Sequence, residues 1–168
     1  MRLHFLWLCG ALLGGCALSD ELGPVGKGPL IPLVNSAGAS TGAVQIEPRA
    51  GGAYLRIAVQ GMSPGDHGLH LHAVGRCDGP DFKSAGAHWN PAGHQHGHLN
   101  MQGPHLGDLP NLTVSANGRG AINFLVAGTL ADADGTSLVI HAKPDDYRTD
   151  PSGNSGDRVA CGVLAAAR

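Results

Sequence analysis

Short apolar stretches, each ended by glycine, proline or other turn residues, follow one another along most of this chain. The stretches lie at residues 30–34, 42–47, 53–59, 68–74, 112–115, 121–126, 137–142 and 159–164. Stretches of this length are too short for ordinary helices, and turn residues between them are typical of strands. The pattern therefore predicts an all-β domain of about eight strands.

Two long segments interrupt the series of predicted strands. Residues 75–110 and 143–157 show no periodicity and are rich in glycine, proline and polar residues. A long structureless loop in a compact domain is usually either functional or disordered. The first segment holds five of the ten histidines of the chain as well as Cys77, and we expect bound metal and a disulfide to order it.

The N-terminus has the pattern of a targeting segment. Residues 3–15 follow Arg2 as an apolar stretch that is too short to span a bilayer and is typical of a signal peptide. The stretch ends in LGGC at 13–16, which resembles a bacterial lipobox and predicts that Cys16 is acylated. Ordinary signal cleavage is the alternative, because Gly15 and Ala17 are both small. The predicted division is a signal peptide at 1–15, a lipidated N-terminus and flexible tether at 16–29, and one domain at 30–168.

Composition and charge narrow the class of protein. The chain has 27 glycines and 11 prolines among 168 residues, which fits a turn-rich β domain. Its formal net charge is −2 and it has no basic run, which argues against nucleic acid as a partner. Cys9 leaves with the predicted signal and Cys16 carries the predicted lipid, so Cys77 and Cys161 remain, and in an oxidising compartment we expect a disulfide between them. The alternative is that one of the two is a metal ligand.

Histidines with metal-ligand spacing are the most informative feature. His70 and His72 stand two residues apart, so a strand would place both imidazoles on one face and Leu69 and Leu71 on the other. Neutral imidazoles on a rigid strand suit copper or zinc. Further candidate ligands are His88, His96, His105, Asp108 and His141. Seven candidates exceed the needs of one four-coordinate ion, whereas a shared ligand would let them serve two ions.

Five motifs in order resemble the copper–zinc superoxide dismutase family. They are GLHLH at 68–72, GAHWNP at 86–91, GPHLGDL at 103–109, LVIH at 138–141 and GNSGDRVACGV at 153–163. The similarity runs from about residue 30 to residue 164. It implies a Greek-key β-sandwich or flattened barrel with two long functional loops. The export signal and the short second loop are similar to those of the bacterial periplasmic branch.

The resemblance implies one copper and one zinc per chain. It assigns His70, His72, His88 and His141 to copper, and His88, His96, His105 and Asp108 to zinc, with His88 bridging the two ions. Three histidines and a carboxylate suit a closed structural zinc site, and four imidazoles suit copper with an open side. Asp145 matches the aspartate that hydrogen-bonds ligands of both metals.

The activity implied is conversion of superoxide to dioxygen and hydrogen peroxide by alternating reduction and oxidation of copper. It would serve antioxidant defence in the cell envelope. His88 would exchange a proton, and Arg158 would dock the anion beside copper. Lys83 is a candidate for electrostatic steering, although an ordinary exposed lysine explains it equally well. The partners expected are superoxide and, through a lipid anchor at Cys16, the membrane; the protein would be a monomer or a homodimer.

Other interpretations predict different residues. A metal carrier on the same scaffold would lack the bridging histidine, the arginine or part of the zinc set, and a structural β-sandwich adhesin would not need seven ligands. His67 has the parity of Leu69 and is expected to be structural. His94 and His98 flank His96, and are either additional metal-recruiting side chains or solvated loop histidines.

Overall fold

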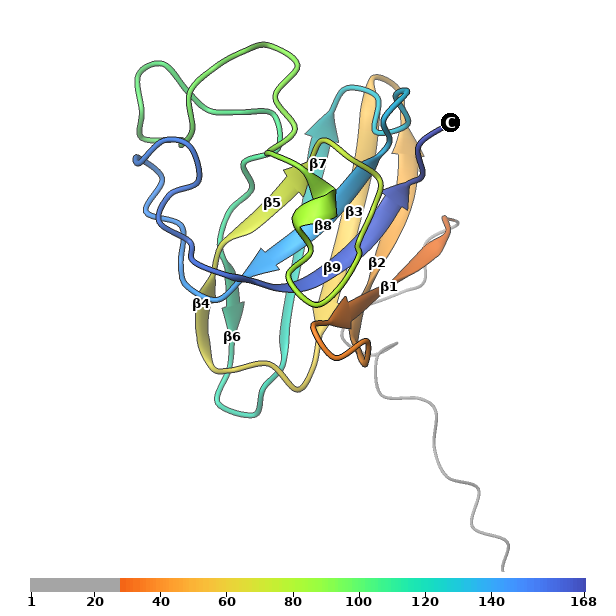
Figure 1. Cartoon of the computed structure of the whole chain (residues 1–168), viewed down its shortest axis with the longest axis vertical. Helices are drawn as coiled ribbons and strands as arrows, with labels where there is room; N and C mark the ends of the chain where they lie inside the picture. Colours follow the sequence, from red (N-terminus) through yellow and green to blue (C-terminus); the bar gives the residue numbers. More distant parts are fainter. Residues whose placement is uncertain (1–27) are drawn as a thin grey trace, which may run out of the picture.

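The computed structural model describes residues 28–168, so the predicted signal peptide, Cys16 and most of the predicted tether lie outside the described residues. Within this part of the chain the backbone forms nine strands and one short 3-10 helix (Figure 1). The elements are β1 (Leu30–Asn35), β2 (Ser40–Arg49), β3 (Gly52–Val59), β4 (Gly65–His67), β5 (Leu69–His72), η1 (Lys83–Ala85), β6 (Leu112–Val114), β7 (Gly120–Ala127), β8 (Thr136–His141) and β9 (Arg158–Ala165). No helix among residues 28–168 is long and apolar enough to cross a bilayer.

Seven strands form one curled antiparallel sheet in the order β5-β8-β9-β1-β2-β3-β7, and β4 pairs with β6 in a second, two-stranded sheet. The first strand lies between β9 and β2, and consecutive strands β7 and β8 lie far apart in the sheet. Between β7 and β8 the chain must therefore cross from one edge strand to the strand next to the opposite edge, which is a Greek-key connection. The fold is the all-β architecture that the sequence predicts.

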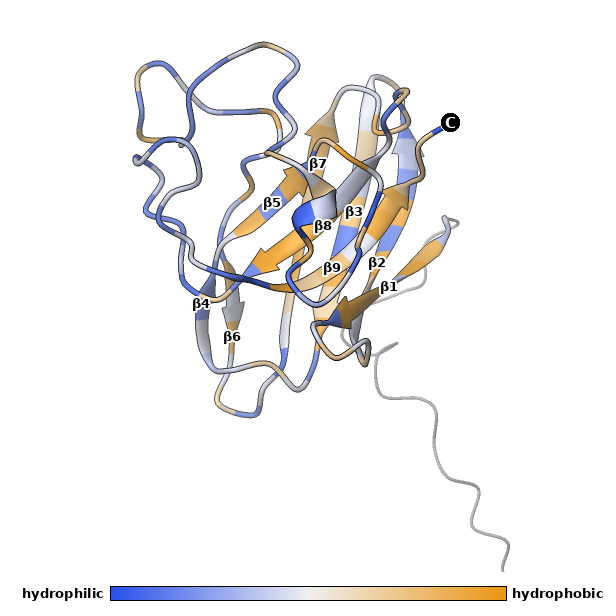
Figure 2. Cartoon of the chain, viewed as in Figure 1, coloured by the Kyte–Doolittle hydropathy of each residue, from blue (hydrophilic) through white to orange (hydrophobic). Residues whose placement is uncertain are grey.

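Alternation along the strands builds the core. Leu69 and Leu71 of β5 pack with Leu138 and Ile140 of β8, and all four side chains are fully buried. Figure 2 shows apolar residues concentrated on the strands and polar residues along the loops. Since successive side chains of a strand point to opposite faces, this packing leaves His70 and His72 on the other face of β5.

All eight predicted stretches contain strands, and one strand was missed. β4 has the sequence Gly-Asp-His, without apolar alternation, and it forms by pairing with Leu112–Val114. The prediction at 68–74 was too long at both ends. Beyond His72, Ala73 and Val74 donate backbone hydrogen bonds to Ala87 and Ala85 in the first loop rather than to a strand.

The two long segments form loops that lie together on one side of the sheet (Figure 1). The first joins β5 to β6 and contains η1, and the second joins β8 to β9. A disulfide between Cys77 and Cys161 attaches the first loop to β9, as the sequence predicts, so neither thiol is available as a metal ligand.

Candidate metal centre

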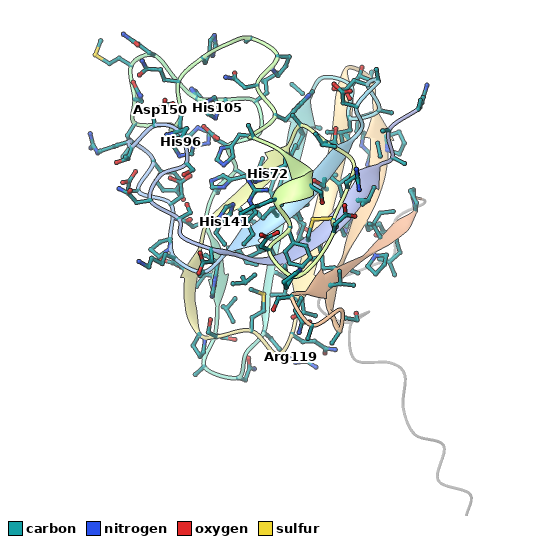
Figure 3. All side chains as sticks on the ribbon, viewed as in Figure 1. His72, His96, His105, Arg119, His141 and Asp150 are labelled. Carbon is teal, nitrogen blue, oxygen red and sulfur yellow. A yellow bond between two sulfur atoms is a disulfide. The ribbon has the colours of Figure 1, made fainter. Side chains whose placement is uncertain are left out.

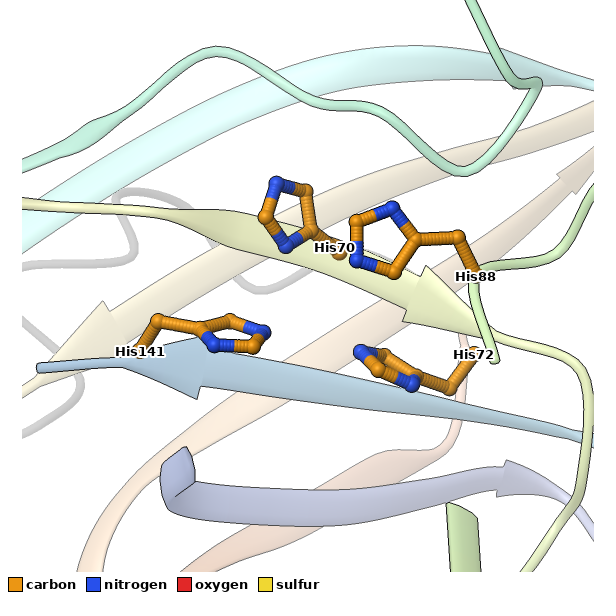
Figure 4. Close-up of side chains that lie close together, drawn as sticks. All are labelled: His70, His72, His88 and His141. Atoms are coloured by element: carbon orange, nitrogen blue, oxygen red, sulfur yellow. The ribbon is translucent and has the colours of Figure 1, made fainter. Parts of the chain in front are cut away.

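Strand register brings the histidines of the first candidate group together. His70 and His72 of β5 pair with Val139 and Ser137 of β8, and His141 at the end of β8 lies opposite Arg158 of β9. His88 of the first loop forms an isolated bridge with His72. Figure 4 shows the four imidazole rings facing one another from β5, β8 and the loop.

Each of these four histidines has one ring nitrogen occupied and one without a partner. His72 Nδ1 donates to the Gly86 carbonyl at 2.9 Å, and His141 Nδ1 donates to the Gly156 carbonyl at 3.1 Å. His70 Nε2 donates to Asp145 Oδ2 at 2.8 Å, and His88 Nδ1 lies 2.9 Å from Asp108 Oδ1. The remaining nitrogens, Nδ1 of His70 and Nε2 of His72, His88 and His141, are buried without a hydrogen-bond partner.

Buried nitrogens without partners are rare in folded proteins, and these four converge. The ligand atoms of this group all lie within 4.8 Å of one another. The hydrogen bonds at the opposite ring positions fix the tautomers so that lone pairs are directed inward. Four imidazole lone pairs in this arrangement fit a copper ion.

A second group converges on one carboxylate oxygen. Asp108 Oδ1 lies 2.9 Å from His88 Nδ1, 2.9 Å from His96 Nδ1 and 3.1 Å from His105 Nδ1. Tetrahedral ligands about 2.0 Å from zinc would be separated by roughly 3.3 Å, so these spacings are close to those of a zinc site. Asp108 Oδ2 is held separately by the backbone N–H groups of Gly97 and His105. Figure 3 shows His96 and His105 on the loop side, away from His72 and His141.

A wider grouping by distance places His70 with His88, His96 and Asp108. We assign His70 to the first group instead, because its Nε2 is bonded to Asp145 and its Nδ1 is one of the four unpartnered nitrogens. His105 belongs to the second group, because its Nδ1 lies 3.1 Å from Asp108 Oδ1 and 3.4 Å from His88 Nδ1.

Asp145 joins the two groups. Its Oδ2 accepts from His70 at 2.8 Å and its Oδ1 accepts from His96 Nε2 at 3.0 Å. Gly153, with φ of 62°, lies directly against this carboxylate, and a Cβ there would be 1.8 Å from Asp145 Oδ1. The sequence therefore needs glycine at this position of the second loop.

The electrostatics favour neutral imidazoles in the first group. Burial lowers the pKa of His70 to about 3 and that of His141 to about 4, and it also lowers the pKa of His72 and His88. Neutral imidazole is the form that binds metal. Burial also acts to lower the pKa of His96, but hydrogen bonds to Asp108 and Asp145 outweigh it and raise that pKa to about 9.

Both carboxylates are ionised. Burial opposes the charge of Asp108 and of Asp145, but hydrogen bonds from the histidines hold the pKa of each well below its usual range. The second group therefore carries the negative charge that a divalent cation requires.

A cavity of about 330 Å³ opens over the first group. Its lining includes His72, His88 and His141, together with Arg158. The guanidinium of Arg158 donates to the carbonyls of Phe82 and Gly86, each at 2.7 Å. Both acceptors belong to the first loop, which the disulfide attaches to β9 close to Arg158. A positive charge is thus fixed at the cavity beside the unpartnered nitrogens.

Comparisons with known proteins agree with this geometry. Residues 40–164 match the family described as copper/zinc superoxide dismutase (SODC). A protein named superoxide dismutase [Cu-Zn] from Caulobacter vibrioides is 43% identical over 138 residues, covering 76% of this chain and 79% of the relative. Superoxide dismutase [Cu-Zn] 1 from Aquifex aeolicus is 38% identical over 142 residues, covering 79% of this chain and 84% of the relative.

A solved structure shares the fold. The double mutant of a SOD-like protein from Bacillus subtilis superposes with a TM-score of 0.77 at 38% identity, covering 82% of this chain and 97% of that one. The chain belongs to the copper/zinc superoxide dismutase family.

Membership of this family gives the chemistry. The protein is an oxidoreductase that acts on superoxide, and its metals are copper and zinc. Structural disulfides are typical of oxidising compartments. With the bacterial relatives, the Cys77–Cys161 bridge indicates an exported protein.

Three of the histidines among residues 28–168 lie outside both groups. His67 is buried, with Nδ1 2.7 Å from the His141 carbonyl and Nε2 2.9 Å from the Ser63 carbonyl, which agrees with a structural role. His94 is exposed and its Nδ1 donates to the Pro104 carbonyl. His98 Nε2 donates to the Asp108 carbonyl at 2.9 Å.

Lys83 lies away from the first group. Its side chain is 83% exposed, and its ammonium forms an ion pair with Asp81 Oδ2 at 2.9 Å. Both residues line a separate cavity of about 560 Å³, which Arg158 also borders. Lys83 therefore shares a cavity with Arg158, and Asp81 compensates part of its positive charge.

Sequence reasoning missed several residues around the site. The carbonyls of Gly86 and Gly156 orient His72 and His141, but backbone acceptors leave no signal in residue types. The Asn111 side chain bonds both the backbone N–H and the carbonyl of Asp145. Tyr147 was missed as well, because only the folded chain brings the second loop against residues 97–111.

Proposed function

We propose that this protein disproportionates superoxide at a copper ion held by His70, His72, His88 and His141. Zinc would be held by His88, His96, His105 and Asp108, with His88 shared and Asp145 orienting His70 and His96. The observation that carries the proposal is the set of four buried, unpartnered imidazole nitrogens beside a cavity that Arg158 borders.

Copper, when bound, would supply a redox couple that accepts the electron given up by one superoxide and passes it to another. The protein's own contribution begins with His88, whose Nδ1 lies among the proposed zinc ligands while its Nε2 faces the copper group. An imidazole held at Nδ1 can accept and release a proton at Nε2 without leaving its place. We assign to His88 the delivery of a proton to the developing peroxide.

Arg158 would bind the anion. Its guanidinium is fixed by two backbone carbonyls, and a positive charge at the cavity attracts and orients superoxide. Lys83 would add to the attraction at longer range, although Asp81 compensates part of its charge. In a chain with a net charge of −2, such local positive charge matters for the rate of encounter.

Metal analysis combined with superoxide turnover tests the proposal. The purified protein should hold about one copper and one zinc, and removing copper by chelation should abolish turnover. Arg158→Ile should keep both metals but lower the rate about tenfold or more, and Arg158→Glu should lower it further by repelling the anion. Rising salt should slow the wild type, because the screening length falls to about 8 Å at physiological ionic strength, and the Glu variant should lose this slowing.

Each result discriminates between functions. Turnover without copper would refute the ligand assignment. A metal carrier has no need of a guanidinium beside copper, so a fall in rate without loss of metal would favour the enzyme mechanism. Equal rates and equal salt dependence in all three forms would show that Arg158 neither docks nor guides superoxide.

We further propose that residues 1–15 are a signal peptide and that acylation of Cys16 anchors the protein in the bacterial cell envelope. Multiple acyl chains would give stable attachment. The lipobox-like LGGC segment and the disulfide support this location. Cys16→Ser should move the protein from the membrane fraction to the soluble fraction without changing its turnover. A wild type that already fractionates as soluble would refute the anchor.

A further inference from the structure

The two long loops contact each other at His98 and Tyr147, on the side of the proposed zinc ligands. The rings of these residues pack edge to face, with centroids 6.0 Å apart and planes at 65°. Neither side chain belongs to a candidate ligand group. Both are nevertheless bonded directly to residues that do hold or orient ligands.

Tyr147 is hydrogen-bonded within its own loop and to two positions of the first loop. Its backbone N–H donates to Asp145 Oδ1 at 2.7 Å, and its carbonyl accepts from Leu99 N–H at 2.9 Å. Its hydroxyl accepts from the backbone N–H of Asn111 at 2.7 Å. The side-chain amide of the same Asn111 bonds the backbone N–H and carbonyl of Asp145.

The backbone at this contact is unusual. Tyr147 has φ of 60°, a left-handed conformation that bulky residues adopt only when their surroundings impose it. Gly97 has φ of 103°, and a Cβ there would lie 2.2 Å from the Tyr147 carbonyl oxygen. The glycine between His96 and His98 thus permits a close approach of the two loops.

His98 completes the connection to the zinc side. Its Nε2 donates to the backbone carbonyl of Asp108 at 2.9 Å. The carboxylate of that aspartate is the group on which His88, His96 and His105 converge. Movement of the Asp108 backbone would therefore displace a ligand atom.

We infer that His98 and Tyr147 are positioning residues that retain zinc, by holding Asp108 and Asp145 in a fixed relation across the two loops. This inference rests on the zinc ligands proposed above. Hydrogen bonds from neighbours fix the orientation of metal ligands, and losing such a partner weakens metal binding. The histidine that follows Gly97 thus serves the site without coordinating a metal.

The rate of zinc release to an excess of chelator tests the inference. His98→Ala should release zinc about three- to tenfold faster than the wild type, the effect of one lost net hydrogen bond. His98→Gln keeps a side-chain donor for the Asp108 carbonyl and should recover most of the retention. His98→Phe keeps only the ring contact and should resemble His98→Ala, and Tyr147→Phe, which removes the hydroxyl, should also release zinc faster.

Matched controls separate this role from general destabilisation. His94→Ala removes the side chain of a histidine of the same loop whose ring bonds the Pro104 carbonyl and neither Asp108 nor Asp145, and it should release zinc at the wild-type rate. With cobalt(II) in place of zinc, the visible spectrum should change in His98→Ala and return in His98→Gln, which a loss of stability alone would not produce.

Two failures would be distinguishable. If His96→Ala still binds zinc, the proposed ligand set is wrong. If His96→Ala loses zinc while His98→Ala releases it at the wild-type rate with an unchanged cobalt spectrum, the ligand set stands and the inference about His98 and Tyr147 is overturned.

Discussion

At the scale of single residues, the second nitrogen of each imidazole decides what the first can do. In His72 and His141 a backbone carbonyl accepts from Nδ1, which leaves the Nε2 lone pair for a metal. In His70 the arrangement is reversed, because Asp145 accepts from Nε2 and Nδ1 faces the group. Residue types and motif order select the candidate ligands, whereas the tautomers depend on acceptors that come from distant segments.

His88 is the one proposed ligand that faces both groups, and this gives a prediction at the residue scale. His88→Ala should weaken copper and zinc binding together, each by more than about tenfold, because both sites lose a nitrogen. His105→Ala should mainly empty the zinc site, since His105 contacts Asp108 and His88 but not the unpartnered nitrogens. Titration of each metal into each variant measures the effect. Loss of zinc alone from His88→Ala would contradict the shared role.

At the scale of elements, the sequence predicted well the strands that depend on local alternation of apolar and polar residues. The apolar period of two located β5 and β8 and placed His70 and His72 on one face, because Leu69 and Leu71 must enter the core. Motif order in the resemblance brought His88, His96, His105 and Asp108 into the prediction although their loop has no periodicity. β4 was not predicted, because its pairing with β6, rather than its residue types, makes it a strand. The contact of Tyr147 with His98 was not predicted either, because it depends on how the folded chain places the two loops against each other.

The first loop is attached to the sheet in two ways, by a disulfide and by packing. The Cys77–Cys161 bridge spans a sequence separation of 84 residues. Phe82 and Ala85 of the same loop pack with Val139 and Cys161 in a small second core. The loop in turn supplies both carbonyls that hold Arg158.

The double variant Cys77→Ser/Cys161→Ser should lose about 4–5 kcal/mol of the free energy of unfolding, the magnitude that chain entropy gives for a loop of this length. Its rate per bound copper should also fall, since the carbonyls that fix Arg158 are no longer tied to β9. Denaturant unfolding and superoxide turnover measure the two effects. Unchanged turnover in a fully metallated variant would show that packing of Phe82 suffices to hold Arg158.

At the scale of the whole molecule, the sheet provides a rigid wall and the loops provide most of the chemistry. The strands contribute His70, His72 and His141, with Arg158 at the start of β9. Both loops lie on one side of the sheet (Figure 1), and the loop between β5 and β6 carries the other proposed ligands, His88, His96, His105 and Asp108. The division explains why a short chain with few aromatic residues can hold two adjacent metal sites, because each loop is ordered by contacts with the other as well as with the sheet.

Asp145 has a consequence for the order in which metals load. One carboxylate orients His70 on the proposed copper side and His96 on the proposed zinc side, so an ion that fixes either ring also prearranges the other. The two binding equilibria are then linked, and linkage is reciprocal. The factor by which bound zinc raises the affinity for copper must equal the factor by which bound copper raises the affinity for zinc. A four-state binding cycle measured for the wild type and for Asp145→Asn should show this factor fall toward unity in the variant. The protein would then acquire its two metals as a cooperative pair, with whichever ion arrives first lowering the cost of ordering the site for the second.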